Sequence, residues 1–271
     1  MGQAHDARTN GGSGGDNRSD HTIEAVDRAA RILFALAAST RESSLMDVAT
    51  RSNLSKPTTF RILSTLIGEG MVTQNAETSS YRLGVLPLGL ASAVLQGVSV
   101  RDLARPIMQS IRDKLNEAVL LSVRDGDTRV NVDAVEAVNA IVQSQQIGVP
   151  IPLYAGAASR AFLAGLSDRA LEDYIGRTDF VAFSETTIVD PNRLREEIRR
   201  VQLQGYAISV AEFTTGGLSI ARLIRNGLGE GVAVMHVSIP RSRADEPAIA
   251  RAVDQLNAGV ASLEQKIRAQ A

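Results

Sequence analysis

The sequence predicts an α+β fold in two parts, a small N-terminal part made mostly of helices and a larger C-terminal part that mixes strands and helices. The length of 271 residues suits one large domain or two modest ones. Apolar residues recur at helical spacing near the N-terminus, whereas strand-like runs appear from residue 118 onward. These strands and helices do not alternate strictly, which favours an α+β over a parallel α/β architecture.

The composition excludes several classes of function. The chain has no cysteine, so disulfides, thiolate metal ligands, cysteine nucleophiles and thiol redox sensors are excluded. Its three histidines, His5, His21 and His236, do not form a metal-binding pattern, and we expect neither a metal nor a cofactor. The formal net charge of −1 gives no general attraction to nucleic acid, so any DNA binding must come from a local patch.

Two segments bear on the location of the protein. Residues 1–21 are rich in Gly, Asn, Asp, Arg and Ser, which predicts a disordered tail without the apolar core of a signal peptide. Residues 83–100 carry no charge, but Pro87, Gln96 and three glycines make them a poor membrane span. We therefore expect a cytoplasmic protein, and we interpret the apolar stretch as a helix buried at a subunit interface.

The N-terminal part is expected to hold three helices and a hairpin. Ser44 precedes the second helix and Asp47 stands three residues later, which is close to a capping box. Ser55 caps the third helix, and Pro57 lies in its first turn, where no N–H is needed. The expected elements are helices over 22–38, 45–52 and 55–68, then strands over 71–74 and 81–83.

The third helix has two distinct faces. On a helical wheel at about 100° per residue, Thr58, Arg61, Ser64 and Thr65 fall within one arc of about 120°. The other positions, 59, 60, 62, 63, 66 and 67, are mostly apolar and predict a wedge that packs against the protein. Hydroxyl groups bond phosphates or base edges, and an arginine binds guanine O6 and N7 bidentately. The free N–H groups of the helix N-terminus attract a phosphate as well.

The surroundings of this helix favour DNA binding. The segment 48–68 contains three basic residues, Arg51, Lys56 and Arg61, and no acidic one. Residues 45–68 taken alone would also fit an ordinary helical hairpin with one polar face. The wider order is a core helix, a tight turn, a capped third helix and a hairpin with Arg82 at its base, and this is the order of a winged helix-turn-helix.

The remaining chain predicts a linker helix and a mixed domain. We expect helices over 85–97 and 99–116, strands over 118–124, 129–135 and 140–144, helices over 155–166, 168–176 and 191–204, strands over 206–210, 218–224 and 231–239, and a last helix over 245–269. In this domain Ser219, His236 and Ser238 are isolated polar residues among apolar ones.

A small-molecule site would need this kind of pattern. The small residues 155–159 at a helix start leave room, and their N–H groups could hold a carboxylate or a similar anion. A few polar groups placed in an apolar cavity are typical of a ligand pocket. Close packing is the alternative, because small residues also let a helix approach a sheet, and a single histidine in a strand is most often a core residue.

Several motifs, in order, resemble the isocitrate lyase regulator (IclR) family of bacterial transcription factors. They are Leu54–Leu63 (LSKPTTFRIL), Leu66–Val72 (LIGEGMV), Tyr81–Gly84 (YRLG), Gly148–Ala164, Gly205–Tyr206 and Glu212–Ala221. The resemblance covers roughly residues 22–268. It implies a winged helix-turn-helix DNA-binding domain (22–84), a linker and dimerisation helix (85–98) and a GAF-like effector-binding domain (99–271). It also implies dimers or tetramers that bind palindromic double-stranded operator DNA.

The resemblance assigns roles by position. The recognition-helix contacts would be Ser55, Lys56, Thr58, Thr59 and Arg61. The basic segment adds Arg51, the wheel adds Thr65 and the hairpin adds Arg82. Pro57 replaces the usual small hydroxyl residue, so any contact from that side chain is lost. The effector-contacting positions would be Ala157, Ala158, Ser209, Gly217, Ser219, His236 and Ser238.

Three of these effector positions depart from the family pattern. Ser209 stands where an acidic residue is frequent, Gly217 where a larger apolar residue is frequent, and His236 where a small hydroxyl residue is usual. The resemblance therefore implies a roomier pocket floor and an effector unlike those of better-known members. Organic and aromatic acids are the metabolites we would test first.

The sequence also bears on two other classes of function. An enzyme is disfavoured because no G-x-S-x-G nucleophile elbow is present, and the glycine-rich segment 227–231 lies between two strands, as a hairpin turn does. A ligand-independent DNA-binding oligomer, whose C-terminal domain serves only assembly, predicts that no metabolite changes DNA affinity. We expect instead an effector-responsive regulator, homodimeric or homotetrameric, that is associated with the nucleoid when bound to DNA.

Overall fold

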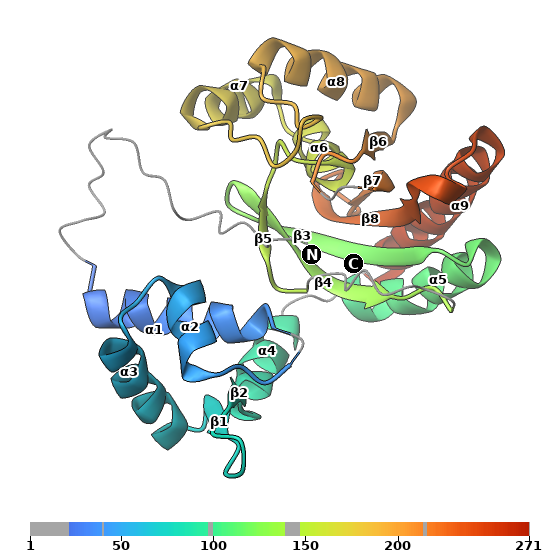
Figure 1. Ribbon diagram of the computed structural model, residues 1–271. Helices are drawn as coiled ribbons and strands as arrows, with labels where there is room; N and C mark the ends of the chain where they lie inside the picture. The colour runs from blue at the N-terminus through green and yellow to red at the C-terminus, as the bar shows by residue number, and fades with distance from the viewer. Residues whose placement is uncertain (1–21, 40, 97–99, 139–146, 214–215, 271) are drawn as a thin grey trace. The chain divides into compact units, whose positions relative to one another are not determined.

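The computed structural model describes residues 22–39, 41–96, 100–138, 147–213 and 216–270. The chain divides into two compact units, one up to Gly97 and one from Val98 (Figure 1). Each unit has its own cluster of buried apolar side chains. The tail expected over 1–21 and the strand expected over 140–144 lie outside the described residues.

The N-terminal unit follows the expected order of elements. It comprises α1 (Glu24–Ala37), α2 (Leu45–Ser52), α3 (Lys56–Gly68), β1 (Val72–Gln74), β2 (Tyr81–Leu83) and α4 (Leu86–Gln96). Its core is formed by Ile32, Leu36, Val48, Leu63, Leu66, Val72 and Tyr81. The strands β1 and β2 pair antiparallel as the hairpin, with Val72 opposite Leu83. Ser43 and Tyr81 exchange two backbone hydrogen bonds, which tie the α1–α2 connection to the hairpin.

Local capping signals fix the helix-turn-helix. The Ser44 Oγ accepts from the Asp47 N–H at 3.2 Å, and the Asp47 carboxylate accepts from the Ser44 N–H at 3.1 Å, so the predicted capping box is present. Asn53 adopts a left-handed conformation (φ 53°) and ends α2. Ser55 then caps α3 by accepting from the Thr58 N–H at 3.4 Å.

The C-terminal unit is built on one six-stranded antiparallel sheet with strand order β5-β4-β3-β8-β7-β6. The strands are β3 (Ala118–Asp125), β4 (Thr128–Val135), β5 (Pro150–Pro152), β6 (Ala207–Val210), β7 (Gly217–Arg225) and β8 (Gly231–Pro240). The helices are α5 (Val100–Leu115), α6 (Ala157–Ala164), α7 (Asp168–Arg177), α8 (Pro191–Gln204) and α9 (Glu246–Gln270), with a short 3₁₀ helix over Arg241–Arg243 that was not expected.

Two helical layers enclose this sheet (Figure 1). On one face α5 and α9 pack against each other, α5 also against β3 and β4, and α9 against β7 and β8. On the opposite face α6 packs against β6, β7, β8 and α8. The α+β prediction is confirmed. The main apolar core lies between the sheet and α6, α7 and α8.

A β-bulge in β4 changes which residues face each layer. Leu121 of β3 is opposite Asp133, but the next residue, Ser122, is opposite Asn131, so Val132 is the extra residue. As a result Asp133 faces α5, where it meets Arg105, while Asn131 faces α6. The bulge therefore places polar side chains of a single strand on both faces of the sheet.

Candidate DNA-binding face and effector site

The outer face of α3 presents two cations that no described residue neutralises. Lys56 and Arg61 are exposed, and neither forms an ion pair with any residue that the structure describes. An open hollow of about 390 Å³ lies at the α2–α3 turn beside Ser55 and Lys56. This face can therefore offer positive charge and hydrogen-bond donors to a polyanion without breaking an internal salt bridge.

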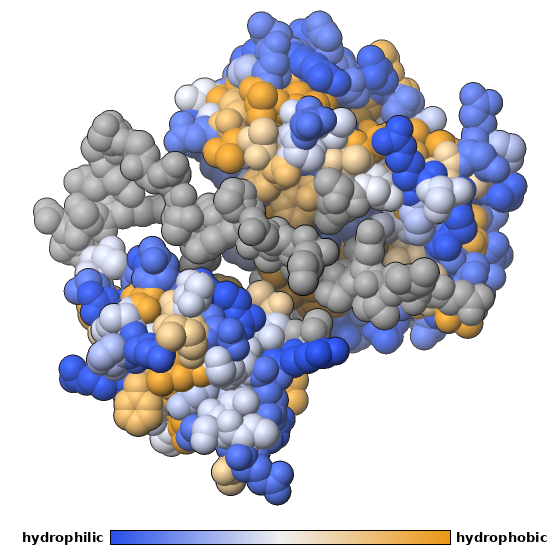
Figure 2. Space-filling model, in the orientation of Figure 1, coloured by the Kyte–Doolittle hydropathy of each residue, from blue (hydrophilic) through white to orange (hydrophobic). Residues whose placement is uncertain are grey.

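One aromatic side chain on this face was not expected there. The wheel placed Phe60 in the buried wedge, but its side chain is 53% exposed. Its exposure follows from the period of 3.6 residues, because Phe60 stands four residues after Lys56 and four before Ser64. The visible face of the N-terminal unit mixes isolated apolar residues with hydrophilic ones (Figure 2).

The predicted contact at Thr59 is wrong. Thr59 has no exposed surface, and its hydroxyl donates to the Ser55 carbonyl at 3.0 Å. The helical wheel had placed position 59 on the inner face, whereas the resemblance had assigned it a DNA contact. A side chain that packs inward cannot reach a groove, so Thr59 is removed from the set of proposed contacts.

The hydroxyls of α3 are already bonded within the helix. Ser55 Oγ and Thr58 Oγ1 lie 2.9 Å apart, and Thr58 is only half-exposed. Ser64 and Thr65 are exposed, but they donate to the carbonyls four residues earlier, at 2.9 and 3.2 Å. Each hydroxyl must rotate away from its present acceptor before it can donate to a phosphate, so the two cations are the more available contacts.

The two remaining arginines of the predicted set are held by the protein's own chain. Arg51 donates from Nε to the Asp47 carbonyl at 3.3 Å and also to the Ser43 hydroxyl. Arg82 at the base of the hairpin lies 3.6 Å from the Glu42 carboxylate. Both side chains are exposed, yet Glu42 offsets the charge of Arg82, which weakens its attraction for a phosphate.

The predicted effector residues come together on the α6 face of the sheet. Ser209, Ser219 and Ser238 are directly opposite one another across β6, β7 and β8. Ala157 and Ala158 are buried in the first turn of α6. A side chain built at the preceding Gly156 (φ +86°) would begin 3.9 Å from the Ser209 Oγ, so the start of α6 lies over this serine row. Gly217 is opposite Pro240, two residues along β7 from Ser219.

His236 joins this row to a buried polar network. Its Nδ1 lies 3.5 Å from the Ser219 Oγ, and its Nε2 lies 3.2 Å from the Ser122 Oγ and 3.3 Å from the Asn131 Oδ1. Burial, and secondarily the charge of Arg129, lower the pKa of His236 well below its ordinary value of 6.5. The imidazole is therefore neutral at pH 7. Because an amide oxygen only accepts, this geometry fits a tautomer with the proton on Nε2.

The rest of the network was missed by sequence analysis. Ser122, Asn131, Arg129 and Ser159 are all buried and hydrogen-bonded to one another. The signal was present in β4, where Arg129, Asn131 and Asp133 occur at every second position of a strand. That alternation predicts a polar row on one face, although it does not reveal the bulge that turns Asp133 away.

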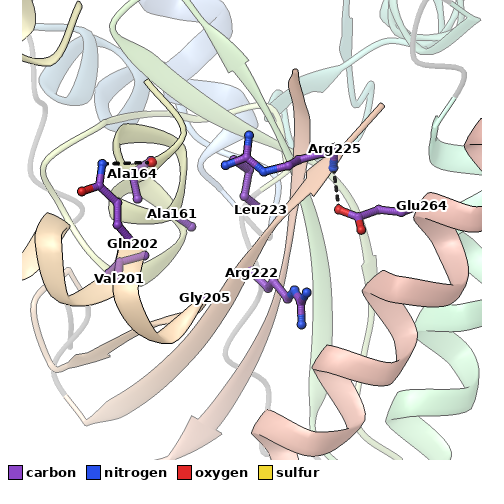
Figure 3. Close-up of a pocket in the computed structure, with 9 residues that line it drawn as sticks. All are labelled: Ala161, Ala164, Val201, Gln202, Gly205, Arg222, Leu223, Arg225 and Glu264. Carbon is purple, nitrogen blue, oxygen red and sulfur yellow. Dashed lines mark hydrogen bonds between the residues drawn. The ribbon is translucent and has the colours of Figure 1, made fainter. Parts of the chain in front are cut away.

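A separate cavity does not coincide with the predicted effector residues. It has a volume of about 280 Å³ and lies between α6, α8, β7 and α9 (Figure 3). Its lining consists of Ala161, Ala164, Val201, Gln202, Gly205, Arg222, Leu223, Arg225 and Glu264. The Arg225 N–H donates to Glu264 at 2.9 Å, and Arg222 donates to Asn257 at 2.6 Å. Two of the lining residues, Arg222 and Arg225, are thus hydrogen-bonded to α9, whereas Gln202 donates to the Ala164 carbonyl at 3.4 Å.

Across the parts of the chain that the structure describes, no helix combines the length and the apolar character that crossing a membrane requires.

The two units together define a class of protein, a winged helix-turn-helix DNA-binding protein with a separate α+β domain.

Comparison with known proteins gives the family. The model of the bacterial transcriptional regulator IclR C-terminal domain matches residues 92–264, and that of the IclR helix-turn-helix domain matches residues 25–76. The chain is 30% identical over 220 residues to the HTH-type transcriptional repressor AllR of Klebsiella pneumoniae, and the matched region covers 81% of each chain. The protein belongs to the IclR family, and it is a DNA-binding transcriptional regulator.

Solved structures agree with this fold. A crystal structure of a Rhodococcus sp. RHA1 protein superposes with a TM-score of 0.74 at 26% identity, covering 91% of this chain and 98% of the other. An IclR homolog from Microbacterium hydrocarbonoxydans, solved in complex with 4-hydroxybenzoate, superposes with a TM-score of 0.72 at 20% identity and covers 90% of this chain and 99% of the other.

Proposed function

We propose that this regulator binds a palindromic operator as a dimer or tetramer, in the cytoplasm, and that a small molecule bound in the C-terminal unit changes its affinity for DNA. The observation that carries the DNA-binding mode is the outer face of α3, where Lys56 and Arg61 are exposed and lack acidic partners among the described residues. The core residues Leu63 and Leu66 on the inner face hold this helix against α1 and α2.

The proposed DNA contacts contribute unequally to binding. Lys56 and Arg61 are the main contacts, and Ser55, Thr58 and Thr65 add hydroxyls after rotation. Arg51 and Arg82 lie at the edge of the surface and contact the phosphate backbone. Base-edge contacts specify a sequence, whereas phosphate contacts position the protein.

Replacing Arg61 by alanine tests this assignment. We expect Arg61→Ala to weaken binding to DNA from the promoter flanking its own gene by about 1–3 kcal/mol. Fluorescence anisotropy titrations at one fixed salt concentration measure the loss, because affinity for DNA depends strongly on salt. Arg169→Ala is the matched control, since this arginine lies in α7 with a 93% exposed side chain. Equal affinity of the Arg61 and Arg169 variants would remove α3 from the interface.

The proposed effector site consists of Ala157, Ala158, Ser209, Gly217, Ser219, His236 and Ser238. Support comes from the register that aligns the three serines and from the hydrogen bond between Ser219 and His236. The homolog from Microbacterium hydrocarbonoxydans was solved with 4-hydroxybenzoate, an aromatic carboxylate, which makes this class of compound the first to test.

A further inference from the structure

A deeply buried arginine in the C-terminal unit has no counter-charge among the residues that the structure describes. Arg129 of β4 is only 6% exposed. Its Nε donates to the Ser159 Oγ at 3.0 Å, and its Nη1 donates to the Ser122 Oγ at 3.2 Å and to the Asn131 Oδ1 at 2.8 Å. All three acceptors are neutral. No aspartate or glutamate among the described residues forms an ion pair with it.

The neighbouring groups do not neutralise this charge either. The next polar residue of the network is His236, which is neutral at pH 7 and carries no negative charge. Burial lowers the pKa of Arg129 to about 10, so the guanidinium keeps its proton at pH 7. The hydrogen bonds from Nε and Nη1 to neutral oxygens do not replace the hydration of a buried ion.

The same domain pairs its other buried charges. Arg160, which is 1% exposed, donates to the Glu212 carboxylate at 2.5 Å. Asp133 lies 3.3 Å from Arg101 and 2.5 Å from Arg105. Arg129 departs from this pattern, and the departure indicates that its counter-charge comes from outside the chain.

The guanidinium lies against a helix start that also favours an anion. Ser159, which accepts from Arg129, is in the first turn of α6. The N-cap of α6 is Gly156, which has no side chain to accept from the first-turn N–H groups. The first two helical residues are alanines, which leave little side chain over these donors. None of the three hydrogen bonds of Arg129 uses its Nη2, so this nitrogen is the donor that we assign to the anion.

We propose that Arg129 binds the carboxylate of a small monoanionic effector, between its guanidinium and the first turn of α6. The site offers one uncompensated positive charge, because Glu212 neutralises Arg160, and it therefore favours a monoanion over a dianion. His236 holds Ser122 and Asn131 in place as acceptors for Arg129. This inference rests on the proposed effector function, and the experiment is chosen to separate the two.

The first measurement compares acids with their neutral amides on the full-length protein. The probes are benzoate, 4-hydroxybenzoate and pyruvate, each beside its amide, with inorganic sulfate as the dianion. We expect at least one acid to raise the Tm, and its Kd to be about 10- to 150-fold lower than that of its amide. This range corresponds to a charge-assisted hydrogen bond of about 1.5–3 kcal/mol.

The second measurement uses variants of matched position. In Arg129→Met the Kd for the acid should rise by the same factor, whereas the Kd for the amide should equal that of the wild-type protein. Arg129→Lys, which keeps the charge, should retain part of the affinity. Arg124→Met is the control, because Arg124 lies on the adjacent strand β3 but is exposed. Should Arg129→Met fail to fold, the acid–amide comparison on the wild-type protein still decides.

The outcomes separate the two proposals. Equal affinity for acid and amide, full acid affinity in Arg129→Met, or no binding by any of the three acids would each overturn the role of Arg129. If a neutral compound binds and changes operator affinity, effector sensing stands without an arginine anchor. If an acid binds through Arg129 but leaves operator affinity unchanged, the anion site stands and effector sensing fails.

Discussion

At the scale of residues, His236 gives the C-terminal unit a defined response to pH. The imidazole is 5% exposed and is held neutral by burial and by the charge of Arg129. In the unfolded chain it titrates near its ordinary pKa of 6.5, whereas in the folded chain its pKa is well below that value. Above pH 6.5 both forms are neutral, and His236 contributes no pH dependence to the free energy of unfolding.

Acidification should therefore destabilise the wild-type protein through this residue. Below pH 6.5 only the unfolded chain binds the proton, so the free energy of unfolding falls by up to about 1.4 kcal/mol per pH unit until the folded-state pKa is reached. His236→Gln should reduce this loss. Urea unfolding at pH 7.5 and 5.5 measures the difference, and carboxylates common to both proteins cancel. Equal losses in the two proteins would show that His236 is not held neutral.

At the scale of elements, the parts that could be predicted from sequence are those fixed by neighbouring residues. The capping box of Ser44 and Asp47, the cap at Ser55 and the hairpin between β1 and β2 all depend on side chains a few residues apart. The polar network of Arg129 was not predicted, because it joins β3, β4, β8 and α6. The bulge at Val132 decides which face its members share, and sequence periodicity does not reveal a bulge.

In an isolated chain, the apolar helix α4 would leave large hydrophobic side chains exposed to solvent. Leu88, Leu90 and Val94 are 69%, 60% and 68% exposed, and Val85 and Leu86 before them are exposed as well. Contiguous apolar surface of this kind is typical of a protein interface. The helix was expected to be buried against a second copy, and this exposure supports the same proposal.

Light scattering tests this use of α4. We expect the wild-type protein to be a dimer or a larger oligomer at micromolar concentration. Leu88→Glu should shift it toward the monomer, because two carboxylates would be buried at a symmetric interface. Leu228→Glu is the control, since this leucine is 85% exposed in the turn between β7 and β8. A wild-type monomer, or an unchanged mass in Leu88→Glu, would contradict an interface through α4.

At the scale of the whole molecule, regulation requires that events in one unit change the other. Each unit has its own core, so each can change stability or conformation without unfolding its neighbour. Within the C-terminal unit, β4 carries Arg129 and Asn131 toward α6 and Asp133 toward α5. Because α5 follows directly after the segment that connects the units, a shift of β4 on binding of the proposed effector would reach that connection through the contact of Asp133 with α5.

Thermodynamic linkage makes this coupling measurable from both sides. If an acid bound at Arg129 changes operator affinity by some factor, saturating operator DNA must change the Kd of that acid by the same factor. We expect a factor of about 5–150, which corresponds to about 1–3 kcal/mol. Calorimetric titration of the tightest-binding acid, with and without operator DNA, measures it. Asp133→Asn should reduce this coupling factor more strongly than it reduces the affinity for the acid. The substitution weakens the contact of β4 with Arg101 and Arg105, but it leaves Arg129 in place. An unchanged factor in this variant would mean that the signal leaves the site by a route other than β4 and α5.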